Sequence, residues 1–218
     1  MIDFSPVDTQ EVRLLDFATR FSVDELRRVT NKSIDTLLSF IDGLTDADVT
    51  FDPIDEHAND PHAVPGEEHI GWSLAHLVAH VTASTEEWAT YASILARGIP
   101  YPADPRLRYE TPWQDITTHT QCVQRLEESR RIRLGYLDTF PDNPNFEIRR
   151  ELSPRYVEKF GEMNAPACFL FGLMHEVGHY DQFREVRRQA LESRQAFDDR
   201  ETVEARQTNA SDQSARSR

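Results

Sequence analysis

The chain has 218 residues, of which 39% are hydrophobic and 28% charged, and its formal net charge is −14. This acidic balance argues against nucleic-acid binding through a basic face, because negative side chains repel a phosphate backbone. The two cysteines form no CxxC motif, so neither a disulfide framework nor a cysteine zinc site is expected. No apolar run reaches the ~18 residues of a membrane span, and we expect a cytoplasmic protein without membrane contact.

Helix-start signals occur early in the chain. Ser5, followed by proline, predicts a short N-terminal helix that runs to about Arg20. Ser22 and Glu25 have the spacing of a capping box, in which both side chains satisfy free backbone N–H groups. Apolar residues then recur at helical spacing, and the first long helix is predicted to end at Gly43.

The next segment, residues 50–68, is acidic and rich in proline, and it predicts a loop. Its histidines lack the regular spacing of a helical ligand pair, so we interpret them as solvated. These histidines lie in or beside the loop: His57, His62 and His69.

Ser73 is the predicted N-cap of a second long helix, which ends at Gly98. Two histidines lie on this helix. His80 lies at the border of the apolar stripe, about 90° from its centre, whereas His76 lies about 130° away and nearer to solvent. A border histidine is compatible with a hydrogen bond or with a metal ligand, and the helix alone does not decide between them.

Two more helices follow. Thr111 begins another capping-box spacing, with proline at the first helical position, so a third helix is predicted from there to about Phe140. Residues 141–163 are predicted to form a long connection. The fourth helix begins near Asn164 and runs to about Ala196, and its apolar first half is typical of a helix at the centre of a bundle.

The predicted fold is all-α, a four-helix bundle with long connecting loops and a short N-terminal helix. We assign residues 1–196 to this bundle domain. Residues 197–218 are polar and lack periodic apolar residues, so we expect a disordered tail.

The fourth helix carries a candidate metal site. His175 and His179 are four residues apart, so they lie on one helix face, where two neutral imidazoles can hold one divalent ion. With Glu176 between them the letters read His-Glu-x-x-His, the zinc-peptidase signature, in which the glutamate is the base. Gly172 and Cys168 lie one and two turns earlier. Their small size leaves room for a ligand pocket, although close helix packing explains them equally well.

Two motifs lie about a hundred residues apart, and their order matters: Trp72-Ser73-x6-His80 and His175-x3-His179-x2-Gln182. Together they resemble the DinB/YfiT-like family of metal-binding four-helix bundles. The resemblance covers about residues 22–196, and it implies that His80, His175 and His179 are the metal ligands, with Gln182 beside them. His76 stands where many members carry glutamate. Three roles are open for His76: a fourth metal ligand, a group that supports a ligand from behind, or a residue of the helix start. We favour the last.

The resemblance also implies chemistry, because characterised members include transferases and isomerases that use low-molecular-weight thiols. Three imidazoles leave an open position on zinc or nickel, where a thiol or water can be activated. The leading hypothesis is therefore a metal-dependent thiol transferase that acts on a small electrophile, in a protein expected to be a homodimer. The alternatives are a metallopeptidase with Glu176 as its base and a non-catalytic bundle that binds a metal or a ligand.

Overall fold

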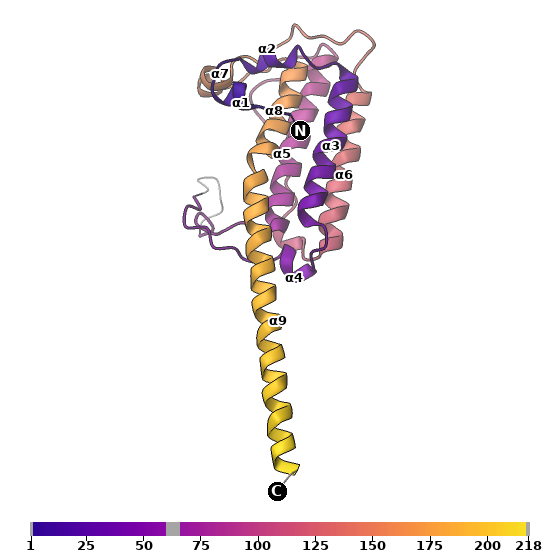
Figure 1. Cartoon of the computed structure of the whole chain (residues 1–218). Helices are drawn as coiled ribbons and strands as arrows, with labels where there is room; N and C mark the ends of the chain where they lie inside the picture. Colours follow the sequence, from indigo (N-terminus) through magenta and orange to yellow (C-terminus); the bar gives the residue numbers. More distant parts are fainter. Residues whose placement is uncertain (1, 60–65, 217–218) are drawn as a thin grey trace.

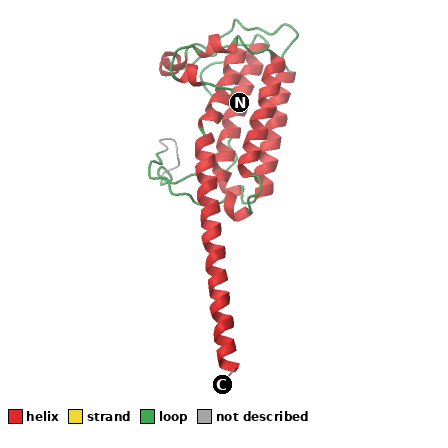
Figure 2. Cartoon of the chain, in the orientation of Figure 1, coloured by secondary structure: helices red, strands yellow, loops and turns green. Residues whose placement is uncertain are grey.

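The computed structural model describes residues 2–59 and 66–216, without the side chains of residues 201–216. All regular secondary structure in these residues is helical, which confirms the predicted all-α class (Figure 2). Long helices run side by side to form the bundle (Figure 1): α3 (Val23–Ile41), α5 (Leu74–Ala96), α6 (His119–Asp138) and α8 (Ala165–Gly178), which α9 (Tyr180–Arg216) continues. None of the helices in the described residues is long and apolar enough to cross a membrane.

The starts of α3 and α5 confirm the capping predictions. The Ser22 hydroxyl accepts the backbone N–H of Glu25, and the Glu25 carboxylate accepts the N–H of Ser22, which completes the capping box. Ser73 caps α5 by accepting the backbone N–H of His76. Each contact satisfies N–H groups that the first helical turn leaves free.

The N-terminal segment differs from the prediction of one short helix. Two helices form instead, α1 (Ser5–Asp8) and α2 (Leu14–Ala18). The chain turns between them at Gln10, which has a φ of 60°. This turn brings Phe4 against Phe17, with ring centroids 5.6 Å apart. Burial of both rings in the core is thus the physical reason for the break.

The predicted start of the third helix at Thr111 was wrong. That region forms only a 3-10 turn, η1 (Trp113–Asp115), and α6 begins at His119. The working capping box is formed by Thr118 and Gln121, seven residues later. The two stretches have the same Thr-x-x-Gln spacing, so the motif alone cannot show which one opens the helix.

A short helix, α7 (Pro154–Phe160), forms within residues 141–163, which were predicted as a connection. Another, α4 (Asp46–Val49), lies between the first long helix and the loop, where no element was predicted. The described part of residues 50–68 has no helix, in agreement with the predicted loop. His57 and His69 are exposed there, as expected, whereas His62 lies outside the described residues.

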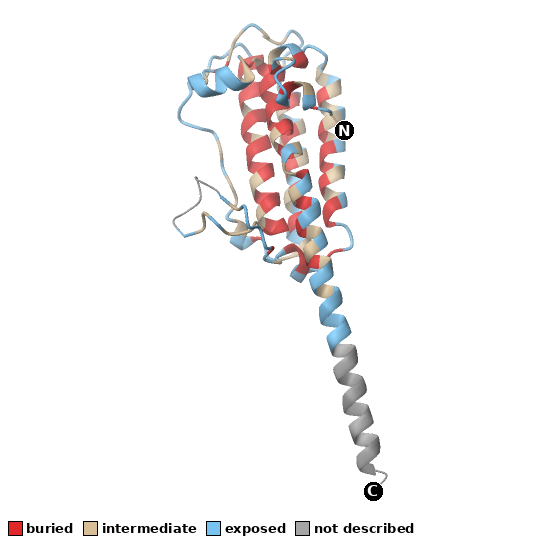
Figure 3. Cartoon of the chain, turned by 60° about the vertical axis from the view of Figure 1, so that its left-hand side comes forward, coloured by how far each residue is buried: buried red, intermediate tan, exposed pale blue. Residues whose placement is uncertain are grey.

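Helices α5 and α8 are the most deeply buried, and they pack directly against each other (Figure 3). Gly172 makes this contact possible. A Cβ atom at Gly172 would lie 3.1 Å from both Thr85 Cα and Trp88 Cβ. The structure therefore gives Gly172 the packing role rather than a place in a ligand pocket.

Helix α9 extends well beyond the bundle (Figure 1). It continues through residues 197–216, whereas the sequence predicted a disordered tail there. The segment is rich in residues that favour helices, and once the packed part of α9 has formed, each added residue gains one backbone hydrogen bond. The division into a bundle domain and a tail stays a prediction.

Candidate metal centre

Three histidines from separate parts of the sequence meet inside the bundle. His80 comes from the second turn of α5, His175 from the last turn of α8, and His179 from the residue between α8 and α9. One ligand nitrogen from each ring can be chosen so that all three lie within 4.8 Å of one another. The Nε2 atoms of His80 and His175 are 3.4 Å apart. All three side chains are half-buried.

This spacing fits a divalent ion. Two nitrogen ligands of a tetrahedral zinc ion, each about 2.05 Å from the metal, lie about 3.3 Å apart. The 3.4 Å separation between His80 and His175 is close to that value. The sequence-predicted triad is thus brought together, with the His80–His175 pair at a separation that suits one metal ion, and no fourth His, Cys, Asp or Glu in the described residues joins the group.

The surroundings keep the imidazoles of His175 and His179 neutral. Burial, together with the nearby His179 and His80, lowers the pKa of His175 to about 3. Burial also lowers the pKa of His179, although its hydrogen bond with Gln182 opposes that shift. The neutral imidazole is the form that binds a metal, so His175 and His179 are ready for coordination at pH 7 without losing a proton.

Hydrogen bonds behind the rings orient the nitrogens differently in the three histidines. His179 Nδ1 lies 2.9 Å from the amide oxygen of Gln182, so its N–H donates there and Nε2 is left for a metal. Gln182 therefore lies where the motif predicted. By contrast, His175 Nδ1 is buried and has no hydrogen-bond partner within the described part of the chain.

His80 is supported by two residues that the sequence analysis missed, both from the loop between α5 and η1. Arg108 Nη2 lies 3.2 Å from His80 Nδ1, and a carboxylate oxygen of Glu110 lies 3.6 Å from the same atom. Arg108 and Glu110 also bind each other through two hydrogen bonds of 3.0 and 2.5 Å. Loop residues of this kind carry no periodic signal, so only the folded chain reveals them.

Glu110 stays ionised beside His80. Burial acts to raise its pKa, but interactions with His80 and Arg108 outweigh that effect and lower the pKa to about 2. A carboxylate behind a metal-binding histidine accepts the Nδ1 proton, fixes the tautomer and increases the basicity of the other nitrogen. The Glu110 oxygen lies 3.6 Å from His80 Nδ1, which is longer than a hydrogen bond, and the Arg108 guanidinium lies closer to that nitrogen at 3.2 Å. Glu110 therefore acts on the His80 ring through its negative charge.

Aromatic rings form one wall of the site. The Trp72 ring lies 4.4 Å from the His76 ring, 4.6 Å from His80 and 5.9 Å from His179, measured between centroids. On its other side His76 stacks on Trp113, at 4.9 Å and with an interplanar angle of 8°. His76 is thus held between two indoles, outside the triad. Its backbone N–H completes the α5 cap, which supports the helix-start interpretation.

Two histidines of the triad lie at a cleft of about 500 Å³, whereas His179 lies at a smaller one of about 220 Å³. The lining of the larger cleft combines the rings of the aromatic wall with charged groups from the α5–η1 loop, and it includes His80 and His175. Its arginines are paired with carboxylates, Arg106 with Glu87 and Arg108 with Glu110. A volume of this size suits a small molecule, and the mixture of aromatic and polar groups suits one that has both an apolar and a polar part.

Glu176 does not point into this site. Its carboxylate accepts hydrogen bonds from Ser33 at 2.5 Å, Tyr180 at 2.7 Å and Arg133 at 2.9 Å, and its side chain is fully buried. These partners come from α3, α6 and α9, because a residue adjacent to His175 projects about 100° away around the helix. The proposed role of Glu176 as catalytic base is therefore not supported, and the metallopeptidase alternative loses its base.

Cys168 also lies outside the cleft. Its side chain is fully buried in the apolar core, and burial raises the pKa of its thiol to about 12. A protonated, enclosed thiol is neither a nucleophile nor a metal ligand. Cys168 thus belongs to the packing of α8, like Gly172, rather than to the ligand pocket that the sequence suggested.

Comparison with known proteins gives one match. The family model of the DinB superfamily matches residues 30–183. This range contains all three histidines, Gln182 and both residues behind His80. Searches of curated proteins and of solved structures found no match.

Proposed function

The chain belongs to the DinB superfamily, and from this premise we propose that it is a divalent-metal-dependent enzyme that transfers a low-molecular-weight thiol to a small electrophile. One observation carries the proposal: three imidazoles have ligand nitrogens within 4.8 Å of one another, and two of them, His80 and His175, line a cleft of about 500 Å³. Three protein ligands leave a coordination position for a substrate, whereas structural zinc sites are usually closed by four.

His80, His175 and His179 would hold the ion through their ring nitrogens. When bound, zinc or nickel supplies a Lewis acid that lowers the pKa of a thiol at the open position and so provides a nucleophile near neutral pH. In the transfer, the thiol sulfur bonds to the electrophilic carbon, the thiol proton passes to solvent, and the leaving group departs with its electron pair.

The residues around the triad would bind and orient the substrates. Trp72 and Trp113, with His76 between them, present flat rings that suit an apolar or unsaturated electrophile. Arg108 and Glu110 hold the His80 ring in place from the side opposite the metal. The proposed partner is thus a small molecule rather than a nucleic acid. On the strength of the family resemblance alone, we also propose a homodimer.

Elemental analysis and a conjugation assay test the proposal together. We expect about one equivalent of zinc or nickel per chain after mild purification, and metal-dependent conjugation of at least one cellular low-molecular-weight thiol with a small electrophile. His80→Ala should lose both properties, because two imidazoles bind a divalent ion weakly. His69→Ala is the matched control, since His69 is exposed and outside the triad.

Each failure has a separate meaning. Less than about half an equivalent of metal in the wild type would contradict the metal site itself. A full equivalent of metal without turnover, across a broad panel of thiols and electrophiles, would contradict the transferase and leave a binding protein.

A further inference from the structure

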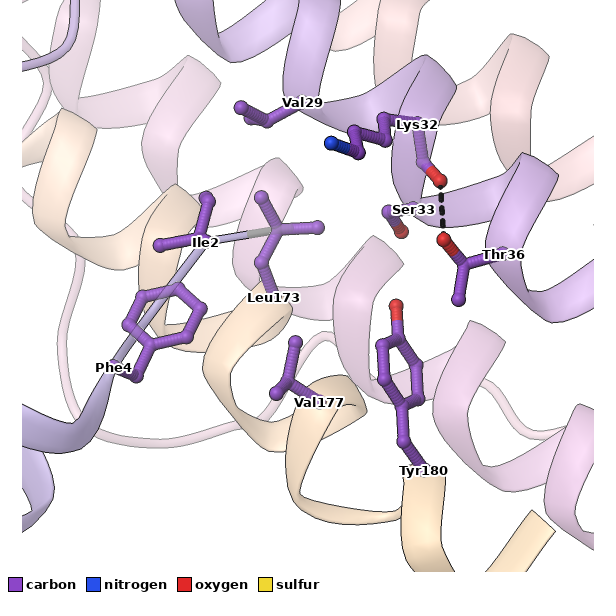
Figure 4. Close-up of a pocket in the computed structure, with 9 residues that line it drawn as sticks. All are labelled: Ile2, Phe4, Val29, Lys32, Ser33, Thr36, Leu173, Val177 and Tyr180. Carbon is purple, nitrogen blue, oxygen red and sulfur yellow. Dashed lines mark hydrogen bonds between the residues drawn. The ribbon is translucent and has the colours of Figure 1, made fainter. Parts of the chain in front are cut away.

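A second cavity lies on the opposite side of the α8–α9 junction from the histidines. It has a volume of about 200 Å³, and its wall is formed by the start of the chain, α3, the end of α8 and the first residue of α9 (Figure 4). Most of its lining is apolar: Ile2, Phe4, Val29, Leu173 and Val177. An apolar cavity of about 150 Å³ is large enough to hold benzene, so this one accommodates a ring with a small substituent.

The polar groups of this cavity gather at one end. Figure 4 shows the hydroxyls of Ser33, Thr36 and Tyr180 close together there. Each hydroxyl already donates its hydrogen: Ser33 and Tyr180 donate to Glu176, and Thr36 donates to the backbone carbonyl of Lys32. Their oxygens therefore offer only lone pairs to a ligand, and this end of the cavity disfavours a negative group.

A positive charge lies at the rim of this cavity, on the side of Val29. Lys32, one of two lysines in the chain, extends its ammonium group over the cavity on the side of Val29 (Figure 4). No ion pair of Lys32 is found among the described residues, although the chain as a whole is strongly acidic. The site thus combines one unpaired cation, an apolar body and an end that accepts hydrogen bonds.

From this arrangement we propose that the cavity binds a small amphiphilic monocarboxylate, the size of benzoate or hexanoate. The carboxylate lies on Lys32, and the apolar body fills the space between Phe4, Val29 and Leu173. A hydroxyl on the far end of the ligand strengthens binding, because it donates to the lone pairs of Tyr180 or Thr36, whereas the Ser33 oxygen already accepts from Arg133. A second carboxylate there is rejected.

The position of the cavity lets its ligand influence the metal site without entering it. Helix α8 separates it from the metal cleft, so its ligand does not reach the open metal position. The Ser33 and Tyr180 hydroxyls at the cavity end hold Glu176, which lies between His175 and His179 on the helix. A ligand that contacts these hydroxyls therefore acts on the turn that carries two of the three imidazoles.

Titration of the full-length protein with benzoate, followed by ligand-observed NMR and calorimetry, tests the proposal. We expect saturable binding with a Kd of about 1 mM or tighter. 4-Hydroxybenzoate should bind more tightly than benzoate, and terephthalate at least tenfold more weakly. Lys32→Met should weaken benzoate at least tenfold and leave benzyl alcohol binding unchanged, because it removes the charge and keeps the apolar stem. Lys159→Met removes the only other lysine and should change nothing.

A second variant addresses the cavity itself. Val29→Phe fills the space from α3 and should abolish the binding of both benzoate and benzyl alcohol, while circular dichroism confirms an intact fold. The proposal is wrong if benzoate does not saturate below about 10 mM. It is equally wrong if both Lys32→Met and Val29→Phe bind benzoate like the wild type.

Discussion

His175 and Glu176 are adjacent in sequence, but they face two very different surroundings. The His175 ring lies at a cleft with a buried Nδ1 atom that has no protein partner in the described chain. The Glu176 carboxylate lies in the bundle interior with three hydrogen-bond donors, from Ser33, Tyr180 and Arg133. One face of this turn is thus incompletely satisfied and suited to a ligand, and the other is fully satisfied and suited to stability.

The His-Glu-x-x-His motif wrongly suggests where Glu176 points. The letters His-Glu-x-x-His predict a base beside the metal, yet the helix turns the glutamate toward α3 and α6. The five residues of the motif thus contain two metal-ligand candidates and one member of a structural ion pair, and helical geometry directs them to different faces.

The largest effect should come from the cleft face. His175→Ala should lower metal affinity by more than about 100-fold, because it removes one of three ligands and leaves two. The bundle should stay folded, with a helical circular-dichroism spectrum like that of the wild type. Competition with a chromophoric chelator measures the affinity. Retention of wild-type affinity would show that the metal does not depend on this triad.

Glu176→Ala should lower stability and leave metal binding unchanged, the reverse of His175→Ala. It leaves the buried guanidinium of Arg133 without its carboxylate, which costs about 3–5 kcal/mol of unfolding free energy. Urea denaturation measures this loss, and metal stoichiometry at low temperature should stay at the wild-type value. Glu128→Gln should cost less than about 1 kcal/mol, because Glu128 is exposed and its partner Arg125 keeps a second carboxylate, Glu86. Loss of metal with unchanged stability would assign Glu176 to the cleft after all.

The pH dependence of stability should also distinguish the cleft face, which carries His175, from the interior face. The pKa of His175 is about 3 in the folded chain and near 6.5 when unfolded, so the unfolded chain binds more protons between these values. Stability of the metal-free protein should therefore fall as the pH drops below 6.5, by about 2 kcal/mol at pH 5. His175→Asn should reduce this dependence, whereas His69→Asn, at an exposed position, should keep it. Equal slopes in all three proteins would contradict the assignment.

Glu110→Gln should have the smallest effect of this series. The neutral amide removes the negative charge beside His80 Nδ1 and polarises the ring less, so metal affinity should fall about tenfold. Chelator competition gives the value, with Glu128→Gln as the exposed control. An unchanged affinity would mean that Glu110 only pairs with Arg108 and does not influence the metal-binding nitrogen of His80.

Much of the bundle could be predicted because its signals are local. The capping residues of α3 and α5 act within one helical turn, and the spacing of His175 and His179 fixes their common face. The meeting of these two with His80 was accessible only through a resemblance between motifs, because periodicity placed His80 merely at the border of an apolar stripe.

The remaining features depend on tertiary contacts. The turn at Gln10 follows from the burial of Phe4 against Phe17, and nothing nearby in the sequence requires it. Arg108 and Glu110 come from an irregular loop whose path is set by packing on α5. The direction of Glu176 depends on partners in distant helices, so the peptidase-like letters could not reveal it.

The position of Trp72 has an optical consequence. Its indole lies within 6 Å of the rings of His76, His80 and His179, so any ion in the triad sits close to a fluorophore. Nickel or copper would quench its emission, whereas zinc, with a filled d shell, would leave it bright. Intrinsic tryptophan fluorescence therefore reports which metal the protein has bound, without any added label.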